Sequence, residues 1–242
     1  MRYGLIADIH GNRWALDAVL FDARRRGVDR WFDVGDCVYG PLDPAGTARR
    51  LRELGALTVR GNQDRVLAEP PDPPDATFRF VHSALSPDEL SWLGGLPRIA
   101  QGGPVFLCHG TPRDDEEPLL EHIDPHGVSL RKTSEVAESL KDVEAEVVVC
   151  GHTHVARLLQ IPDGPLVINP GSVGLPAYTD DLPFPHAMEA GSPHARYAIL
   201  QRSAAGWSVE QHAVAYATED AAFAAESNGR PDWARRLISG RA

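Results

Sequence analysis

Short apolar runs alternate with amphipathic segments through the first part of the chain. Apolar positions dominate residues 2–8, 30–35 and 56–60, a pattern that predicts three strands. Between these runs, apolar side chains recur at helical spacing within residues 15–23 and across residues 44–54, which predicts two helices. The resulting β-α-β-α-β order favours right-handed crossovers and a sheet with a parallel core.

The second part of the chain contains most of the remaining predicted strands. Apolar runs predict strands at 104–108, 146–150, 155–161, 166–169, 196–202 and 207–214. Helices are expected at 129–142 and from residue 218 onwards, and two short helices within residues 76–96. Ser86 and Glu89 form a capping box at the start of the second of these.

Three polar segments interrupt this pattern. The proline-rich run at residues 70–74 predicts a surface linker. Residues 111–128 read as an acidic loop, and residues 174–195 as a long loop rich in Pro, Gly, Asp and His. We expect one α/β domain over residues 1–242, in which 66–96 and 174–195 can form a rim or cap.

Composition narrows the classes of function. No apolar stretch reaches the roughly 20 residues that a membrane helix needs, and no signal peptide is recognisable, so we expect a cytoplasmic protein without a membrane partner. The net charge of −10 argues against general nucleic-acid binding. It is compatible with a small phosphorylated substrate, because bound metal ions supply local positive charge. The oligomeric state stays open.

Five of the predicted strands are each followed at once by a short polar motif. These motifs are A-D-I-H-G-N, V-G-D, R-G-N-Q-D, C-H-G and G-H-T-H. Strands of a parallel or mixed sheet bring their carboxyl ends to one edge, so the motifs can meet there. They offer seven metal ligands: Asp8, His10, Asp36, Asn62, His109, His152 and His154. Such a mixed oxygen and nitrogen set suits Mn, Fe or Zn, and exceeds the needs of one tetrahedral ion.

Each motif taken alone has a simpler interpretation. A single His is more often structural than a ligand, and Asn62 could be only a turn residue. Asn12 could cap the helix that follows it. The conjunction of five motifs behind five strands favours a centre of two metal ions that share a carboxylate.

The ordered set resembles the calcineurin-like metallophosphoesterase superfamily, whose pattern is D-x-H, G-D, G-N-H-[DE], a His next to Gly, and G-H-x-H. The resemblance runs from Asp8 to His154 and extends into the segment from Asn169 to Gly174, which is similar to the compact prokaryotic phosphodiesterase branch. It implies a four-layer α-β-β-α sandwich with two mixed sheets and the metal site at the carboxyl ends of the strands.

The resemblance also implies two divalent ions, with Mn the first choice and Fe, Zn or Ni as alternatives. It assigns Asp8, His10 and His154 to the first ion and Asn62, His109 and His152 to the second, with Asp36 bridging both. A carboxylate suits this bridge because its two oxygens can each bind one ion. The implied reaction is hydrolysis by a hydroxide between the metals.

Gln63 departs from the family pattern, which has His at this position. A Gln amide can donate hydrogen bonds but cannot give a proton to a leaving group. Asp64, which in the family orients that His, could hold the Gln63 amide instead. Five histidines are alternative acids by type only, and each is as readily an ordinary surface residue: His82, His122, His126, His186 and His194.

Two residues near the motifs are candidates for substrate binding. Arg113 follows His109 by four residues and could grip a phosphate in a bidentate manner, or form an ion pair with the acidic residues beside it. Asn12 is the second candidate, and Arg13 beside it a weaker one.

These observations predict a binuclear metal-dependent phosphoesterase that hydrolyses phosphodiesters or small nucleotides, with Asp36, Asn62, Gln63 and Asp64 in the catalytic machinery. A phosphomonoesterase, including a protein phosphatase, or a dinucleoside polyphosphate hydrolase is the alternative. Because Gln63 replaces the usual His, a weakly active scaffold or sensor is an alternative of another class. Substrate specificity is expected to lie in residues 66–86, 111–128 and 174–195.

Overall fold

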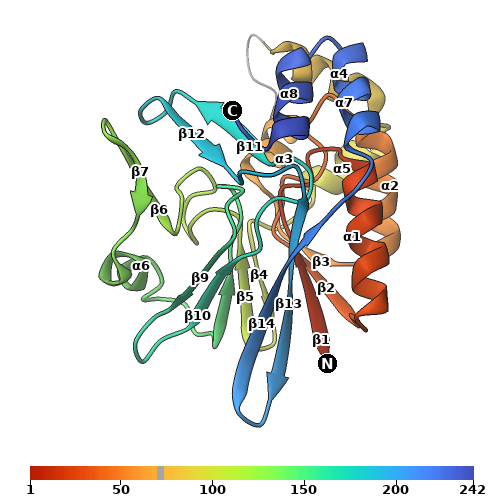
Figure 1. The fold of residues 1–242 in the computed structure, drawn as a ribbon. Helices are drawn as coiled ribbons and strands as arrows, with labels where there is room; N and C mark the ends of the chain where they lie inside the picture. Colours follow the sequence, from red (N-terminus) through yellow and green to blue (C-terminus); the bar gives the residue numbers. More distant parts are fainter. Residues whose placement is uncertain (70–73) are drawn as a thin grey trace.

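Two five-stranded mixed sheets pack face to face in the computed structural model, which describes residues 1–69 and 74–242 (Figure 1). The first sheet has the order β14-β13-β1-β2-β3. Its strands are β1 (Arg2–Ile6), β2 (Arg30–Asp33), β3 (Leu57–Thr58), β13 (Ala195–Ser203) and β14 (Gly206–Val214). The first three run parallel, as the crossovers predict, and β13 and β14 form an antiparallel hairpin at the edge.

The second sheet has the order β4-β5-β8-β10-β9. Its strands are β4 (Ile99–Gly102), β5 (Val105–Cys108), β8 (Val147–Val149), β9 (Arg157–Gln160) and β10 (Leu166–Asn169). The three central strands run parallel and the two outer strands antiparallel. Strands β5 and β8 are buried along their whole length, because apolar layers cover both faces.

Helices cover the outer faces unequally. The first sheet and its upper rim carry α1 (Arg13–Arg25), α2 (Pro44–Leu54), α3 (Asn62–Ala68), α4 (Ala76–Ala84), α5 (Pro87–Gly94), α7 (Thr218–Ser227) and α8 (Pro231–Ser239). Among the described helices, α6 (Thr133–Ser139) alone covers the second sheet. The expected four-layer sandwich is therefore confirmed, with a much thinner second helical layer (Figure 1).

Three buried apolar clusters correspond to the three interfaces of the sandwich. Residues such as Leu5, Val34 and Val147 fill the space between the sheets. Leu16 of α1 belongs to the cluster under the first helical layer, and Val136 of α6 to the cluster under the second. The layers hold the strand ends in fixed positions, because close-packed interiors leave little room for displacement.

The prediction of a loop at 111–128 followed by a helix at 129–142 is wrong in part. A hairpin of β6 (Glu121–Asp124) and β7 (Gly127–Leu130) occupies this stretch, and the helix is limited to α6. Val128 and Leu130 alternate with polar residues at the period of a strand, and Gly127, the first residue of β7, has a φ of +120°. The Asp124 carboxylate accepts a hydrogen bond from the His126 backbone and stabilises the turn of this hairpin.

Residues 174–195 also contain structure that the pattern did not predict. Strands β11 (Ala177–Asp180) and β12 (His186–Glu189) pair as a hairpin inside the expected loop. Helix α3 and strand β4 were likewise not predicted. Of the expected linker at residues 70–74, residues 70–73 lie outside the described part of the chain. None of the described helices is both long and apolar enough to span a membrane.

Candidate metal centre

The carboxyl ends of four parallel strands deliver six of the seven predicted ligands to one place. Asp8 and His10 follow β1, Asp36 follows β2, His109 follows β5, and His152 and His154 follow β8. Asn62 begins helix α3, directly after β3. Two overlapping groups have ligand atoms close enough to hold a metal ion: Asp8 with His10 and His154, and Asp8 with Asp36 and His109.

The backbone at these turns adopts a conformation that side chains other than glycine rarely take. Six non-glycine residues in the described part of the chain have a positive φ, and five of them are predicted ligands. These are Asp8 (54°), His10 (50°), Asp36 (55°), His152 (70°) and His154 (61°). Strained backbone of this kind persists where the surrounding structure enforces it, and it concentrates at functional sites.

Three of the ligand histidines have their ring orientation fixed by the backbone. Each Nδ1–H donates to a carbonyl oxygen, which leaves Nε2 as an acceptor facing the centre. These bonds join His10 to Tyr39 (2.9 Å), His109 to Val34 (2.6 Å) and His154 to Leu175 (2.7 Å). Such carbonyl partners are typical of imidazoles that bind metals.

The first group of ligands leaves acceptors facing one another. The Nε2 atoms of His10 and His154 are 3.0 Å apart, and Nε2 of His154 is 3.6 Å from Oδ1 of Asp8. The other Asp8 oxygen, Oδ2, is buried without a hydrogen-bond partner in the described residues. Facing lone pairs and an unpartnered carboxylate oxygen repel one another unless a cation lies between them. These residues therefore fit a metal ion.

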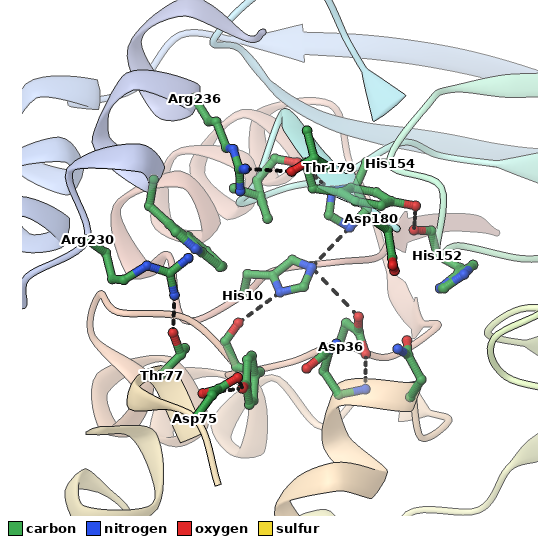
Figure 2. Close-up of a pocket in the computed structure, with 16 residues that line it drawn as sticks. His10, Asp36, Asp75, Thr77, His152, His154, Thr179, Asp180, Arg230 and Arg236 are labelled. Carbon is green, nitrogen blue, oxygen red and sulfur yellow. Dashed lines mark hydrogen bonds and ion pairs between the residues drawn. The ribbon is translucent and has the colours of Figure 1, made fainter. Parts of the chain in front are cut away.

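The second group shares Asp8 with the first and adds Asp36 and His109. Oδ2 of Asp36 lies 3.5 Å from Nε2 of His109. The same oxygen lies 3.7 Å from Nε2 of His10 (Figure 2). Nε2 of His109 is also 3.1 Å from Oδ1 of Asn62. One oxygen of Asp36 thus stands between a histidine of each group, as a bridging carboxylate would.

His152 is placed less centrally than the other histidines. Its ring lines the same pocket, with its centroid 5.3 Å from that of His109. It does not belong to either of the two compact ligand groups. The backbone N–H of His152 donates to Oδ1 of Asp8 at 3.2 Å, so the G-H-T-H turn orients the carboxylate as well as supplying imidazoles.

The buried charges shift the pKa values of these ligands strongly. Burial raises the pKa of Asp8 to about 8. Burial alone would lower the pKa of His109, but the Asp36 carboxylate stabilises the imidazolium and brings this pKa to about 10. Burial also opposes ionisation of Asp36, and the positive charge that His109 can carry outweighs it and holds the Asp36 pKa below its usual value. The buried carboxylates thus stabilise positive charge in the site, and metal ions can supply that charge.

Asp64 positions the turn that carries Asp36 and does not bind Gln63. Its buried carboxylate accepts hydrogen bonds from the backbone N–H groups of Asp36 (2.8 Å), Cys37 (3.0 Å) and Gly61 (3.0 Å). The expectation that Asp64 could hold the Gln63 amide is therefore wrong. The backbone N–H of Gln63 instead donates to Oδ1 of Asp36 at 2.9 Å, and its side chain lines the pocket.

The segment from Asn169 to Gly174 holds two ligand turns in place. The amide of Asn169 donates to the carbonyl of Gly151 (2.8 Å) and to the hydroxyl of Thr153 (3.1 Å), inside the G-H-T-H turn. The hydroxyl of Ser172 donates to the carbonyl of Asp8 at 2.7 Å. These contacts explain why a polar segment without ligands follows the last motif.

The two residues predicted to bind substrate lie elsewhere. Asn12 is fully buried; its Oδ1 accepts the backbone N–H of Ala15 as a helix cap, and its amide donates to Gly174. Arg113 is exposed and forms an ion pair with Asp142. Neither side chain lines the pocket over the candidate ligands. Arg13 is likewise occupied by an ion pair with Asp43.

None of the five histidines considered as alternative acids reaches the pocket. His82 stacks on Phe78, and His122 is exposed beside Asp124. Among the described residues that line the pocket, every histidine is a predicted metal ligand. The site therefore lacks an imidazole at the position where the family places its proton donor.

The pocket over the ligands has a volume of about 220 Å³, and much of its wall was not predicted. Its roof comes from β11 and α8, and its side from the start of α4 (Figure 2). The unpredicted residues are Tyr39, Asp75, Thr77, Leu175, Tyr178, Thr179, Asp180, Arg230, Trp233 and Arg236. The ring of Trp233 lies edge-on to His10, with centroids 5.9 Å apart, so α8 packs directly on a ligand. The only sequence signal for the α8 part of this wall is the presence of arginines on both sides of Trp233.

The fold and the converging ligands define a metal-dependent phosphoesterase. A family model for the calcineurin-like phosphoesterase superfamily domain matches residues 1–185. The chain belongs to this superfamily, which confirms the resemblance of its motifs.

One relative in sequence and two solved structures are similar to this chain over most of its length. An uncharacterized protein of Methanocaldococcus jannaschii is 28% identical over 200 residues, which cover 71% of this chain and 76% of that protein. A metallophosphoesterase from Sphaerobacter thermophilus superimposes with a TM-score of 0.77 at 27% identity, covering 99% of both chains. A hypothetical protein from Pyrococcus horikoshii has the same fold, with a TM-score of 0.75 at 18% identity and coverage of 99% and 98%.

Proposed function

We propose that this protein uses two divalent metal ions, Mn the first choice, to hydrolyse phosphodiesters or small nucleotides. The observation that carries this proposal is the position of Asp36, whose Oδ2 lies between His10 and His109 and joins the two ligand groups. The superfamily supports a hydrolase of phosphoric esters.

The residues of the first ion would be Asp8, His10 and His154, and those of the second Asn62, His109 and His152, with Asp36 shared. When bound, two such ions lower the pKa of water to about 7 and neutralise charge on phosphate oxygens. The protein contributes preorganisation: backbone carbonyls fix the imidazoles, and Asp64 fixes the turn of Asp36.

The site would activate the attack on phosphorus, but it offers no acid to protonate the leaving group. Gln63 lines the pocket at the position of the family's proton donor and can offer only hydrogen bonds from its amide. Good leaving groups do not need a proton, so the site favours esters and anhydrides whose leaving group is a stable anion. General acid catalysis typically contributes about 10²–10⁴-fold, and this factor is the expected cost for poor leaving groups.

Metal analysis combined with a hydrolysis assay tests the proposal. Elemental analysis of protein reconstituted with Mn²⁺ should find two ions per chain, and bis(p-nitrophenyl) phosphate should be hydrolysed faster than p-nitrophenyl phosphate. One ion per chain would contradict the binuclear centre. A preference for the monoester would contradict the choice of phosphodiesters. Binding of both ions without turnover of any phosphoester would favour a sensor or scaffold.

A further inference from the structure

Arg230, the N-cap residue of α8, and Arg236 within the helix both line the metal pocket, but only Arg230 holds a carboxylate in a bidentate contact. Arg230 uses all three of its nitrogens: Nε and Nη2 bind the Asp232 carboxylate (2.9 and 2.7 Å), and Nη1 binds the Thr77 hydroxyl. Its charge is therefore neutralised within α8 itself.

Arg236 is left without a matched partner. Nη2 donates to the Thr179 hydroxyl at 2.9 Å, and the nearest carboxylate, that of Asp232, is 3.8 Å from Nη1 and already paired with Arg230. Within the described residues no hydrogen bond occupies Nε or Nη1. The side chain is only 18% exposed, and this burial lowers the pKa of Arg236 by disfavouring the cation. An anion in the pocket would relieve that cost.

The position of Arg236 relative to the ligands defines what it can contact. Trp233 lies against the ring of ligand His10, and Arg236 follows Trp233 by three residues on the same face of α8. Side chains at this spacing are neighbours about 5–6 Å apart. On the other side, Thr179 follows Tyr178, whose ring is 4.7 Å from that of ligand His154. The guanidinium thus lies one layer of side chains away from the metal ligands (Figure 2).

The pocket also contains Asp180, whose charge must be considered. Burial lowers the pKa of His152, and the nearby Asp180 carboxylate opposes this effect, so Asp180 lies near His152. Arg236 lies on the side of α8, so the two opposite charges are separated across the roof (Figure 2). The roof therefore has a cationic side and an anionic side.

We propose that Arg236 and Thr179 form a subsite for a second phosphate next to the one that is cleaved. The preferred substrates are then nucleotides with a phosphoanhydride, such as nucleoside diphosphates or dinucleotides joined through a pyrophosphate. A guanidinium suits this role because its planar fork binds two phosphate oxygens at once. This inference rests on the proposed function, since the metals hold the first phosphate.

Two ligands that cannot be hydrolysed distinguish binding at the subsite from binding at the metals. Methylphosphonate offers one phosphonate, and methylenediphosphonate offers two with a bridge that cannot be hydrolysed. Their dissociation constants are measured by calorimetry on the Mn²⁺-loaded protein, with metal content checked after titration. Arg236→Gln should weaken the diphosphonate at least tenfold more than the monophosphonate. Arg236→Lys, which keeps the charge but loses the fork, should give an intermediate loss of selectivity.

Arg235→Gln is the matched control. Arg235 is the preceding residue of α8, but it is exposed and does not line the metal pocket. This variant should bind both ligands as the wild type does. Equal losses for the two ligands in Arg236→Gln, or the same selectivity loss in Arg235→Gln, would overturn the subsite. If Arg236→Gln does not fold, Arg236→Lys decides in the same way.

The outcome is independent of turnover. Arg236-dependent binding of the diphosphonate in a protein that hydrolyses no phosphoester would leave the subsite standing and sink the proposed function. Hydrolysis of bis(p-nitrophenyl) phosphate, together with diphosphonate binding that is unchanged in Arg236→Gln, would support the proposed function and refute the subsite.

Discussion

The Nε2 atoms of His10 and His154 lie 3.0 Å apart, and neither can donate a hydrogen bond to the other. Both rings give their Nδ1–H to a backbone carbonyl, so two lone pairs face each other in a buried space. This arrangement is unfavourable without a cation and favourable with one.

Replacement of Asp36 should remove both metal ions together. In Asp36→Ala the carboxylate oxygen between His10 and His109 is lost, and with it the ligand that the two proposed ions would share. Elemental analysis should find little bound metal, and turnover should fall by at least about 10³-fold. Asp181→Ala, which changes an exposed carboxylate of the β11–β12 connection, is the control and should keep both ions. Full occupancy in Asp36→Ala would refute the bridging role.

The two histidines of the G-H-T-H turn should affect different ions. His154 faces His10 and Asp8 in the first group, so His154→Ala should weaken the first ion. His152 lies beside His109, so His152→Ala should mainly weaken the second. Loss of one ion should reduce kcat far more than it changes KM, because the metals act on the transition state. A variant with unchanged kcat would show that the residue is not a ligand.

Asp64 should matter for stability as well as for activity. Asp64→Ala leaves three buried backbone N–H groups without an acceptor, at Asp36, Cys37 and Gly61. Each unsatisfied donor costs about 1–3 kcal/mol, so the free energy of unfolding should fall by about 3 kcal/mol or more. Urea denaturation measures this, with Asp181→Ala as the exposed control expected to change by less than about 0.5 kcal/mol. An equally small change in Asp64→Ala would mean that water replaces the carboxylate.

Gln63 should make the rate depend steeply on the leaving group. Without a proton donor, aryl phosphodiesters should be cleaved much faster than alkyl ones, because aryl oxides carry negative charge more easily. Gln63→His restores an imidazole at the position, although Asp64 is committed to three backbone groups and cannot orient it freely. A series of aryl esters of graded leaving-group pKa should give a shallower slope for Gln63→His. Identical slopes for the two proteins would contradict a role for this position in leaving-group departure.

Arg113 should be dispensable for substrate binding. Its guanidinium forms an exposed ion pair with Asp142 and lies outside the pocket. Arg113→Gln should leave KM within about twofold and the free energy of unfolding within about 1 kcal/mol, as is usual for surface ion pairs. Steady-state kinetics and urea denaturation measure these quantities. A tenfold rise in KM would show that the loop carrying Arg113 closes over the substrate.

The sequence by itself indicated the candidate ligand set and determined the order of the first strands. Asp8, Asp36, His109 and His154 could be recognised because each follows an apolar run, and strand ends are local features that the chain pattern reveals. The parallel β-α-β opening follows from the same alternation, since crossovers have one favoured hand.

Only the tertiary structure decided which polar residues near the motifs face the ligands. Asn12 and Arg113 are close to ligands in sequence, yet one caps a helix and the other pairs with Asp142. Arg236 is 82 positions beyond His154 and still reaches the roof of the pocket, because Trp233 anchors α8 against His10. Contacts between residues so distant along the chain depend on how whole layers pack, and no local pattern contains that information.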